Sequence, residues 1–239
     1  MTTTGIHVSS WVKPMAEILR LGDIEFDEAV ARTDAILRGG DLVIMPTDTV
    51  YGLVGDITAE AAEKIFALKG RDDSKPLPVL VGDIEQLRQV EAGMSLAGSL
   101  LADRYWPGPL TIVVYRHDGV PAQITAARDT IGVRMPDHPF PLALLQRHGG
   151  PLIATSANNS GEPAATSVSQ LTEELIASVG LVLDGGDCPR RQASTVIDLT
   201  VTPPTVLREG PVTAEQLAKA LCTQVQMAPD EQPATKALI

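Results

Sequence analysis

The 239-residue chain has few aromatic residues and fewer basic than acidic residues, and both shortages argue against a nucleic-acid-binding protein. Aromatic residues make up 3 % of the chain, too few for a platform on which single-stranded bases stack. The chain has 19 Lys and Arg against 30 Asp and Glu, a formal net charge of −11. Because affinity for nucleic acid comes largely from neutralised phosphates, such a chain is a poor general binder of polyanions. An anionic ligand must therefore be held by a local cluster of cations.

Cysteine is also scarce, and the patterns of disulfide-rich, zinc-binding and membrane proteins are missing. Cys188 and Cys222 form no C-x-x-C motif, which predicts two reduced thiols in a reducing compartment. The four histidines lack metal-ligand spacing, so we expect no metal site formed by the protein. No apolar run approaches the ~18 residues that cross a bilayer, and the N-terminus lacks the pattern of a signal peptide. We therefore expect a cytoplasmic protein that does not bind membranes.

Apolar segments of strand length alternate with helical patterns along most of the chain, which is typical of a layered α/β domain. Strands are predicted at residues 42–46, 77–81, 110–115, 131–135, 151–155, 181–184, 195–199 and 205–208. Helices are predicted at 27–38, 58–69, after Asp83, and at 95–105, 139–148, 168–178 and 213–221. Consecutive strands late in the chain indicate a mixed sheet. We expect one domain at residues 20–222, between an N-terminal arm at 1–19 and a loosely ordered C-terminal tail at 223–239.

Two segments carry polar or basic groups next to predicted strands and helices. Residues 46–53 (PTDTVYGL) follow a buried strand, where open α/β sheets bind ligands, although a capped turn explains the same residues. Lys69, Arg71 and Lys75 lie between a helix and a strand. Favourable cations at a helix C-terminus explain Lys69, but Lys75 lies beyond the turn. The cluster therefore favours a phosphate-binding loop, in which Arg binds oxygens in pairs and Lys acts as a point charge.

Two further segments place polar groups in or after strands. Arg134 lies in the middle of an apolar strand, where a charge is costly unless it is paired. It forms either a structural ion pair or a contact with a ligand carboxylate or phosphate. Residues 154–161 (ATSANNSG) form a loop dense in hydroxyl, amide and glycine groups, which either binds anions and ribose or forms a self-bonded turn. The chain has no P-loop, no G-x-G-x-x-G and no G-x-S-x-G motif.

Together these segments resemble the YrdC/Sua5 family, the threonylcarbamoyl-AMP synthases, over about residues 26–221. The resemblance also includes KPL at 75–77, WPGPLT at 106–111, GVRMPDHP at 132–139, STVIDL at 194–199 and LREG at 207–210. The family's Lys-Arg-Ser-Asn tetrad is complete in Lys69, Arg71, Ser156 and Asn158. The resemblance implies a twisted, open mixed sheet flanked by helices, around a concave basic cavity, with residues 20–222 as the catalytic domain. The second domain of the longer Sua5 branch is not expected after residue 221.

The resemblance implies an enzyme that joins L-threonine, bicarbonate or CO₂, and ATP into L-threonylcarbamoyl-AMP and pyrophosphate. A tRNA threonylcarbamoyl transferase complex then moves the threonylcarbamoyl group to adenosine 37 of tRNA. Mg²⁺ is expected to accompany ATP, because no dedicated carboxylate cage is visible. One alternative is a module that binds double-stranded RNA, against which the net charge argues. Another is a paralogue that handles a different carbamoyl group.

The resemblance also implies roles for individual residues. Lys69 and Arg71 are the expected catalytic residues, and Arg71→Ala is expected to remove most adenylate synthesis while leaving the fold intact. The expected ATP-binding residues are Lys69, Arg71, Lys75, Thr130, Ser156, Asn158, Ala164 and Arg208. The expected threonine-binding residues are Thr47, Thr49, Leu80, Arg134, Ala154 and Ser194. Leu80 and Ala164 depart from the family, in which many members have His at the first position and Ser or Thr at the second.

Overall fold

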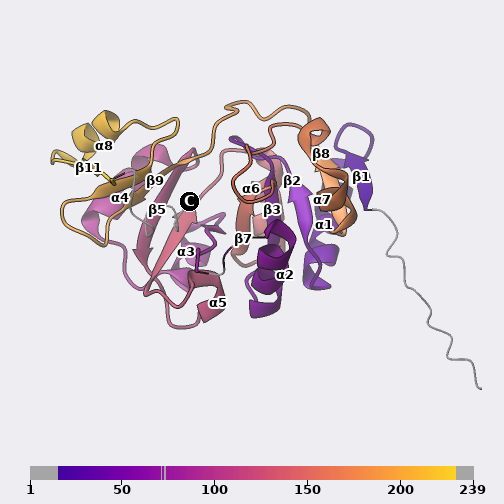
Figure 1. Ribbon diagram of the computed structural model, residues 1–239, viewed down its shortest axis with the longest axis horizontal. Coiled ribbons are helices and arrows are strands. Elements are labelled where there is room, and N and C mark those ends of the chain that lie inside the picture. The colour runs from indigo at the N-terminus through magenta and orange to yellow at the C-terminus, as the bar shows by residue number, and fades with distance from the viewer. Residues whose placement is uncertain (1–15, 71, 73, 230–239) are drawn as a thin grey trace, which may run out of the picture.

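A computed structural model describes residues 16–70, 72 and 74–229 (Figure 1). Within these residues, an 11-stranded sheet runs through the molecule in the order β1-β8-β2-β3-β7-β4-β6-β5-β9-β10-β11. Parallel pairs such as β5 with β9 and antiparallel pairs such as β3 with β7 make it a mixed sheet, as predicted. The strands are β1 (Glu17–Arg20), β2 (Val43–Met45), β3 (Gly52–Asp56), β4 (Val79–Leu80), β5 (Leu110–Tyr115), β6 (Thr130–Arg134), β7 (Leu152–Ser156), β8 (Leu181–Asp184), β9 (Thr195–Asp198), β10 (Thr205–Arg208) and β11 (Gln226–Met227).

Helices flank the sheet and pack in pairs. Contacts join α1 to α6, α2 to α5 and α4 to α8. The described part of the chain has no helix that is both long enough and apolar enough to cross a membrane. The α-helices are α1 (Phe26–Arg38), α2 (Ala59–Lys69), α3 (Ile84–Val90), α4 (Leu96–Tyr105), α5 (Ala122–Thr125), α6 (Pro139–His148), α7 (Glu173–Ala177) and α8 (Ala214–Leu221), and η1 (Val168–Gln170) is a 3₁₀ helix.

Two apolar clusters cover the two faces of the sheet, because successive side chains of a strand point to opposite faces. In β2, Ile44 belongs to one cluster, whereas Val43 and Met45 belong to the other. The cluster of Ile44 includes residues of all helices from α2 to α5 and of α7 and α8, whereas the cluster of Val43 includes residues of α1 and α6. As described, the second cluster contains no residue of β5, β6 or β9. One face of these three strands is therefore left without a helical cover.

The structure contains elements that the sequence analysis did not predict. β1 takes in the last residues of the predicted N-terminal arm, and β11 lies within the predicted tail, while residues 1–15 and 230–239 lie outside the described residues. The helix predicted at 168–178 is divided into η1 and α7, because Leu171 is extended and the Thr172 side chain caps the start of α7. β3 was missed because its two glycines weaken a strand pattern. A Cβ at Gly55 would lie 2.8 Å from the Leu42 side chain and 3.1 Å from Ala61 Cβ, so a larger residue would force these neighbours to shift.

Candidate active site

A cavity opens on the uncovered face of β5, β6 and β9. Strand alternation directs Thr111 and Val113 of β5 and Arg134 of β6 into it, while Ile112 and Val133 point into the core. The opposite wall comes from the β2–β3 connection and from β7, and the whole space is about 860 Å³ with its open mouth included. The lining residues are Thr47, Thr49, Val50, Tyr51, Gly52, Pro76, Leu77, Pro78, Leu80, Thr111, Val113, Gly132, Arg134, Ala154, Thr155, Ser156, Ala193, Ser194, Val196 and Arg208.

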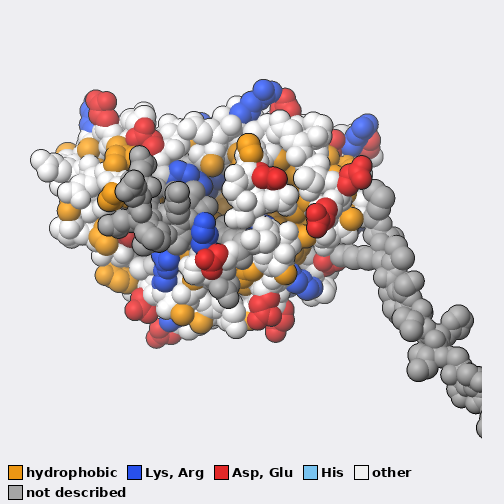
Figure 2. All heavy atoms as spheres, in the orientation of Figure 1, with side chains coloured by type: hydrophobic (Ala, Val, Ile, Leu, Met, Phe, Trp, Pro, Cys, Tyr) orange, Lys and Arg blue, Asp and Glu red, His pale blue; other side chains and the backbone are white. Residues whose placement is uncertain are grey.

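The charged residues among those that line the cavity are Arg134 and Arg208. On the face drawn in Figure 2, basic side chains gather near the middle, and acidic side chains lie mainly around them. An acidic chain can therefore present cations locally, as binding of a single anionic ligand requires.

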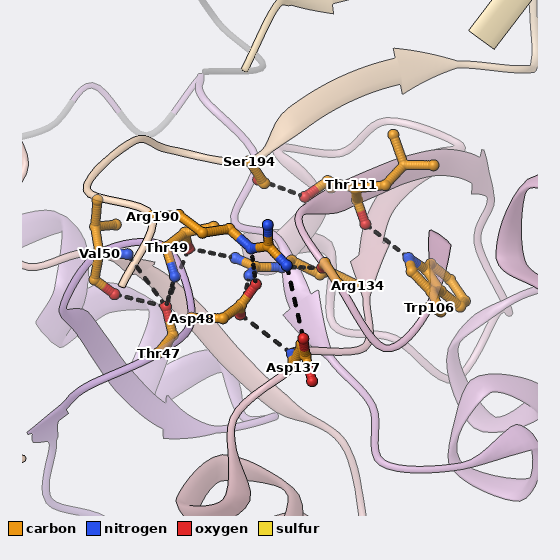
Figure 3. A network of polar contacts seen from close by, with 12 residues as sticks. Thr47, Asp48, Thr49, Val50, Trp106, Thr111, Arg134, Asp137, Arg190 and Ser194 are labelled. Carbon is orange, nitrogen blue, oxygen red and sulfur yellow. Dashed lines mark hydrogen bonds and ion pairs between the residues drawn. The ribbon is translucent and has the colours of Figure 1, made fainter. Parts of the chain in front are cut away.

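Arg134 is a buried cation at the centre of the site (Figure 3). It forms an ion pair with Asp48, and the two side chains are 8 % and 2 % exposed. Its Nε donates to the Gly108 carbonyl over 2.9 Å, and its Nη1 donates to Thr49 Oγ1 over 2.7 Å. Burial lowers the pKa of the Arg134 guanidinium, which the Asp48 carboxylate opposes and Arg190 reinforces. Three of the five guanidinium N–H groups thus bind described protein atoms, and two remain for a ligand.

Two threonine hydroxyls extend this contact into a chain of polar contacts. Thr47 Oγ1 donates its proton to the Val50 carbonyl over 2.7 Å. Thr47 Oγ1 accepts from the Thr49 and Val50 N–H groups over 3.1 and 3.3 Å, which occupy its two lone pairs, and it lies 3.0 Å from Thr49 Oγ1. Thr49 Oγ1 itself accepts from Arg134. Thr49 Oγ1 thus keeps a second lone pair as an acceptor, and Thr49 lines the cavity.

Lys69 lies behind the wall formed by Ser156, at the C-terminal end of α2. Its residue is 4 % exposed, and its ammonium donates to the Ser156 carbonyl and, over 3.1 Å, to Asn158 Oδ1. Ser156 Oγ donates to the same Asn158 oxygen over 2.5 Å, and Asn158 Nδ2 donates to the Glu162 carbonyl. The loop after β7 is thus self-bonded, as one interpretation of its sequence predicted, and it also positions a buried cation at the cavity wall.

A β-bulge directs Arg208 into the cavity. Val206 pairs with Ile197 and packs in the core, so strict alternation would turn Arg208 to the core as well. The register shifts between Val206 and Arg208, and Arg208 instead pairs with the cavity-lining Val196. Its guanidinium donates to the Ser194 carbonyl over 2.9 and 3.0 Å and to Ser194 Oγ over 3.3 Å. The Ser194 hydroxyl also lies 2.9 Å from Thr111 Oγ1.

The structure brings most of the predicted site residues to one cavity. All six predicted threonine-binding residues line it: Thr47, Thr49, Leu80, Arg134, Ala154 and Ser194. Of the predicted ATP-binding residues, Ser156 and Arg208 line it, and Lys69 and Asn158 are bonded to Ser156. Lys75, Thr130 and Ala164 are not among the lining residues. Arg71 lies outside the described residues.

Sequence reasoning missed the partners of Arg134. Asp48 lies in the PTDTVYGL motif, but nothing in the sequence pairs it with Arg134, a strand residue 86 positions away. Arg190 N–H donates to the Asp48 carbonyl over 3.1 Å, and its Nε lies 3.4 Å from Asp48 Oδ2. A cation in a loop gives no signal by itself. The two alternatives for Arg134, an ion pair and a ligand contact, are compatible, because two of its five N–H groups have no partner among the described residues.

The fold and the sequence both match known proteins. The family model of Sua5, YciO and YrdC proteins, described as "Telomere recombination", matches residues 35–210. The threonylcarbamoyl-AMP synthase of Pyrococcus abyssi is 40 % identical over 186 residues, which cover 77 % of this chain and 55 % of that protein. The threonylcarbamoyl-AMP synthase of Bacillus subtilis is 36 % identical over 193 residues, 80 % of this chain and 56 % of that protein.

A solved structure agrees with these matches. The crystal structure of P. abyssi Sua5 complexed with L-threonine superposes with a TM-score of 0.85 at 36 % identity, over 90 % of this chain and 63 % of that one. The present chain thus spans little more than half the length of the two relatives named above. The family match covers most of the described residues, including the strands that form the cavity. The chain belongs to the Sua5/YciO/YrdC family.

Proposed function

We propose that this chain synthesises L-threonylcarbamoyl-AMP from L-threonine, bicarbonate or CO₂, and ATP, with release of pyrophosphate. It would thus act as a nucleotidyltransferase on ATP in the first step of tRNA N6-threonylcarbamoyladenosine formation. The proposal rests on one observation: a single cavity combines Arg134, which has N–H groups left unbonded by the described residues, the acceptor hydroxyl of Thr49, and a wall behind which the buried Lys69 lies. The names of the relatives support the same reaction.

The Arg134 side of the cavity suits the zwitterion of an amino acid. The two remaining N–H groups of Arg134 fit a carboxylate, which guanidinium groups bind in pairs. Thr49 Oγ1 offers an acceptor next to them, as an ammonium or hydroxyl group of the same ligand requires. Leu80 and Ala154 add apolar lining that fits a short side chain with a methyl group. These features support L-threonine as the amino-acid substrate, with Ser194 as a further contact.

The Ser156 side suits the phosphates of ATP. Lys69 supplies a buried ammonium behind Ser156, and Arg208 supplies a guanidinium at the rim formed by β10. From the sequence, Arg71, Lys75, Thr130, Asn158 and Ala164 are the remaining candidates for ATP contacts. The described residues contain no group of three or more His, Cys, Asp or Glu that could hold a metal ion. We therefore assign Mg²⁺ to the substrate, as the ion that enters with ATP.

The reaction then needs the protein to position the substrates and to neutralise the charge on the phosphates, and it needs no protein nucleophile. The threonine ammonium loses a proton, and the resulting amine attacks CO₂ and forms a carbamate with loss of a second proton. When bicarbonate supplies the carbon, the amine forms the carbamate with release of water. A carbamate oxygen attacks the α-phosphorus of ATP, and the bond from that phosphorus to the pyrophosphate oxygen breaks. Arg134 would hold the carboxylate so that the amine faces the reacting carbon, and Lys69 would offset charge that develops on the phosphates. The product would pass to a tRNA threonylcarbamoyl transferase complex in the cytoplasm.

The proposal is tested by leaving out one substrate at a time. The purified chain is incubated with ATP, L-threonine and bicarbonate, and pyrophosphate and the adenylate are measured by coupled assay and mass spectrometry. Both products are expected only when all three substrates are present. Arg191→Ala serves as a control variant, because this side chain is 64 % exposed and pairs with Asp187, and neither residue lines the cavity. Pyrophosphate release that does not depend on threonine, or no adenylate with all three substrates, would contradict the proposal.

A further inference from the structure

The connection between β8 and β9, residues 185–194, is called the crossover here. β8 and β9 are separated in the sheet by six strands, so the crossover passes from one half of the molecule to the other (Figure 1). Its last residues, Ala193 and Ser194, line the cavity. The position of the crossover therefore affects the site directly.

Hydrogen bonds fix the first part of the crossover to the β2–β3 connection. Tyr51 Oη donates to the Gly186 carbonyl over 2.7 Å and accepts from the Gly185 N–H over 3.2 Å. The Arg190 N–H donates to the Asp48 carbonyl over 3.1 Å. Burial raises the pKa of Tyr51 to about 12, so this phenol keeps its proton at any physiological pH. The backbone of the crossover thus has anchors that do not depend on the Arg190 side chain.

The Arg190 side chain makes two ion pairs of its own (Figure 3). Its Nε lies 3.4 Å from Asp48 Oδ2, and its Nη2 lies 3.6 Å from Asp137 Oδ2. The Arg190 side chain is 39 % exposed, Asp137 is 59 % exposed and Asp48 is 2 % exposed. Solvent screens the outer pair with Asp137 much more than the inner pair with Asp48.

The inner contacts give one carboxylate two guanidinium partners. Asp48 alone would balance the charge of Arg134 and leave little attraction for a ligand carboxylate. With Arg190 on its other oxygen, the Asp48 carboxylate and the two guanidiniums together carry a net charge of +1, and the exposed Asp137, which solvent screens, offsets little of it. The charge of Asp48 is then shared between two guanidiniums, so Arg134, which lines the cavity, keeps more of its positive charge uncompensated.

We propose that Arg190 is a positioning residue for the amino-acid substrate, which shares Asp48 with Arg134 and thereby keeps Arg134 attractive to the substrate carboxylate. This inference rests on the proposed function. It concerns a side chain outside the lining residues that acts through Asp48 and Arg134. Loss of Arg190 should therefore weaken use of threonine and leave use of ATP unchanged, because its ion pairs are with Asp48 and Asp137, whereas Lys69 donates to Ser156 and Asn158.

The test compares Arg190→Ala, Arg190→Lys and Arg191→Ala with the unmodified chain, using steady-state kinetics and calorimetric titration with L-threonine. Arg191→Ala removes an adjacent arginine and the same charge, but its partner is Asp187. For Arg190→Ala we expect the threonine KM and Kd to rise about tenfold, which corresponds to about 1.4 kcal/mol, with kcat and the ATP KM unchanged. Arg190→Lys should recover part of the loss because it restores the charge, and Arg191→Ala should match the unmodified chain.

Several outcomes would overturn the inference. An unchanged threonine KM in Arg190→Ala would remove the role of Arg190, while the proposed function would stand. Equal losses for threonine and ATP, or a lower kcat that Arg190→Lys does not repair, would indicate a purely structural role. An equal rise of the threonine KM and Kd in Arg191→Ala would show that the effect comes from general surface charge and not from Arg190. If the unmodified chain neither binds nor uses threonine, the proposed function itself fails, and the inference fails with it.

Discussion

Two buried carboxylates in this molecule, Asp48 and Asp34, each bind several basic side chains, yet only Asp48 binds an arginine that lines the cavity. Asp48 forms ion pairs with Arg134 and Arg190, and these three residues form the site cluster, with Asp48 at its centre. The Asp34 carboxylate, on α1, lies 3.0 Å from Arg38 Nε, 2.8 Å from His148 Nδ1 and 3.7 Å from Arg147 Nε. These four residues form the helix cluster. The two clusters have the same composition: each contains a largely buried aspartate and at least two arginines.

The difference lies in whether an arginine of the cluster lines the cavity. In the helix cluster, Arg38 Nη2 also donates to the His148 carbonyl over 2.6 Å, and His148 Nε2 faces Asp56 at 3.3 Å. These groups join α1 to α6 and none of them lines the cavity. In the site cluster, Arg134 keeps two donors and lines the cavity. A buried ion pair alone is thus no evidence of a functional site, whereas spare donors that face a cavity are.

The largest expected effect comes from removing the centre of the site cluster. Asp48→Ala leaves a buried guanidinium without its carboxylate, so we expect the free energy of unfolding to fall by about 3–5 kcal/mol. Urea denaturation followed by circular dichroism measures it. Asp137→Ala is the matched control, because that carboxylate is 59 % exposed and surface ion pairs contribute about 1 kcal/mol or less. Equal losses in the two variants would show that the burial of Asp48 carries no special weight.

Arg134→Lys keeps the charge of the site cluster but removes its forked donors. A lysine cannot hold the Gly108 carbonyl, Thr49 and Asp48 and also bind a carboxylate in pairs. We expect the Kd for L-threonine to rise about 100-fold, as loss of a charge-assisted pair of hydrogen bonds of about 2.7 kcal/mol would produce. Calorimetric titration measures this Kd. A Kd within threefold of the original would place the amino-acid carboxylate elsewhere.

Asp34→Asn disturbs the helix cluster and is expected to affect stability alone. Loss of charge-assisted hydrogen bonds should reduce the free energy of unfolding by about 2 kcal/mol at pH 7, with the kinetic constants for threonine and ATP unchanged. A changed threonine KM would remove the distinction between the two clusters.

The same variant has a pH signature. Burial acts to raise the pKa of Asp34, but hydrogen bonds from His148 and Arg38 and their charges outweigh it, so the pKa lies below the usual value of 3.8. A depressed pKa contributes stability that is complete above about pH 4 and is lost as the pH falls through the folded-state pKa. The gap between the original chain and Asp34→Asn should therefore narrow below about pH 4. A gap that widens on acidification would contradict the assignment.

The smallest expected effect comes from the end of the hydroxyl chain. Thr49→Val keeps the shape of the side chain but removes the acceptor toward the cavity, so we expect the Kd for threonine to rise about tenfold. Thr49→Ser retains the hydroxyl and should stay within about threefold of the original, as measured by the same titration. A loss in Thr49→Ser as large as in Thr49→Val would indicate packing rather than hydrogen bonding.

The sequence predicted the α/β class, the mixed sheet and most of its strands, because apolar runs and strand alternation are local properties. It also predicted the residues on the Arg134 side of the cavity, since Thr47, Thr49, Ala154 and Ser194 lie in motifs with a known order. It could not predict β1 or β11, whose exposed residues carry no apolar pattern.

Other features depend on contacts between segments far apart in the sequence. The bulge that turns Arg208 toward the cavity is a change of register between β9 and β10, which composition does not encode. The shared carboxylate of Asp48 depends on a crossover that passes six strands, so neither Asp48 nor Arg190 carried a local signal. Side-chain direction within a strand is predictable from its period, whereas partners across the sheet are not.

We expect Arg134, and not Lys69, to receive the amino-acid carboxylate, and the phosphates of ATP to lie on the Ser156 side of the same cavity. A crystal structure of this chain with L-threonine and a non-hydrolysable ATP analogue tests this expectation most directly. In that structure the threonine carboxylate should lie within hydrogen-bond distance of Arg134, and the phosphates should lie against Lys69. A carboxylate bound away from Arg134, or a nucleotide bound outside this cavity, would contradict it.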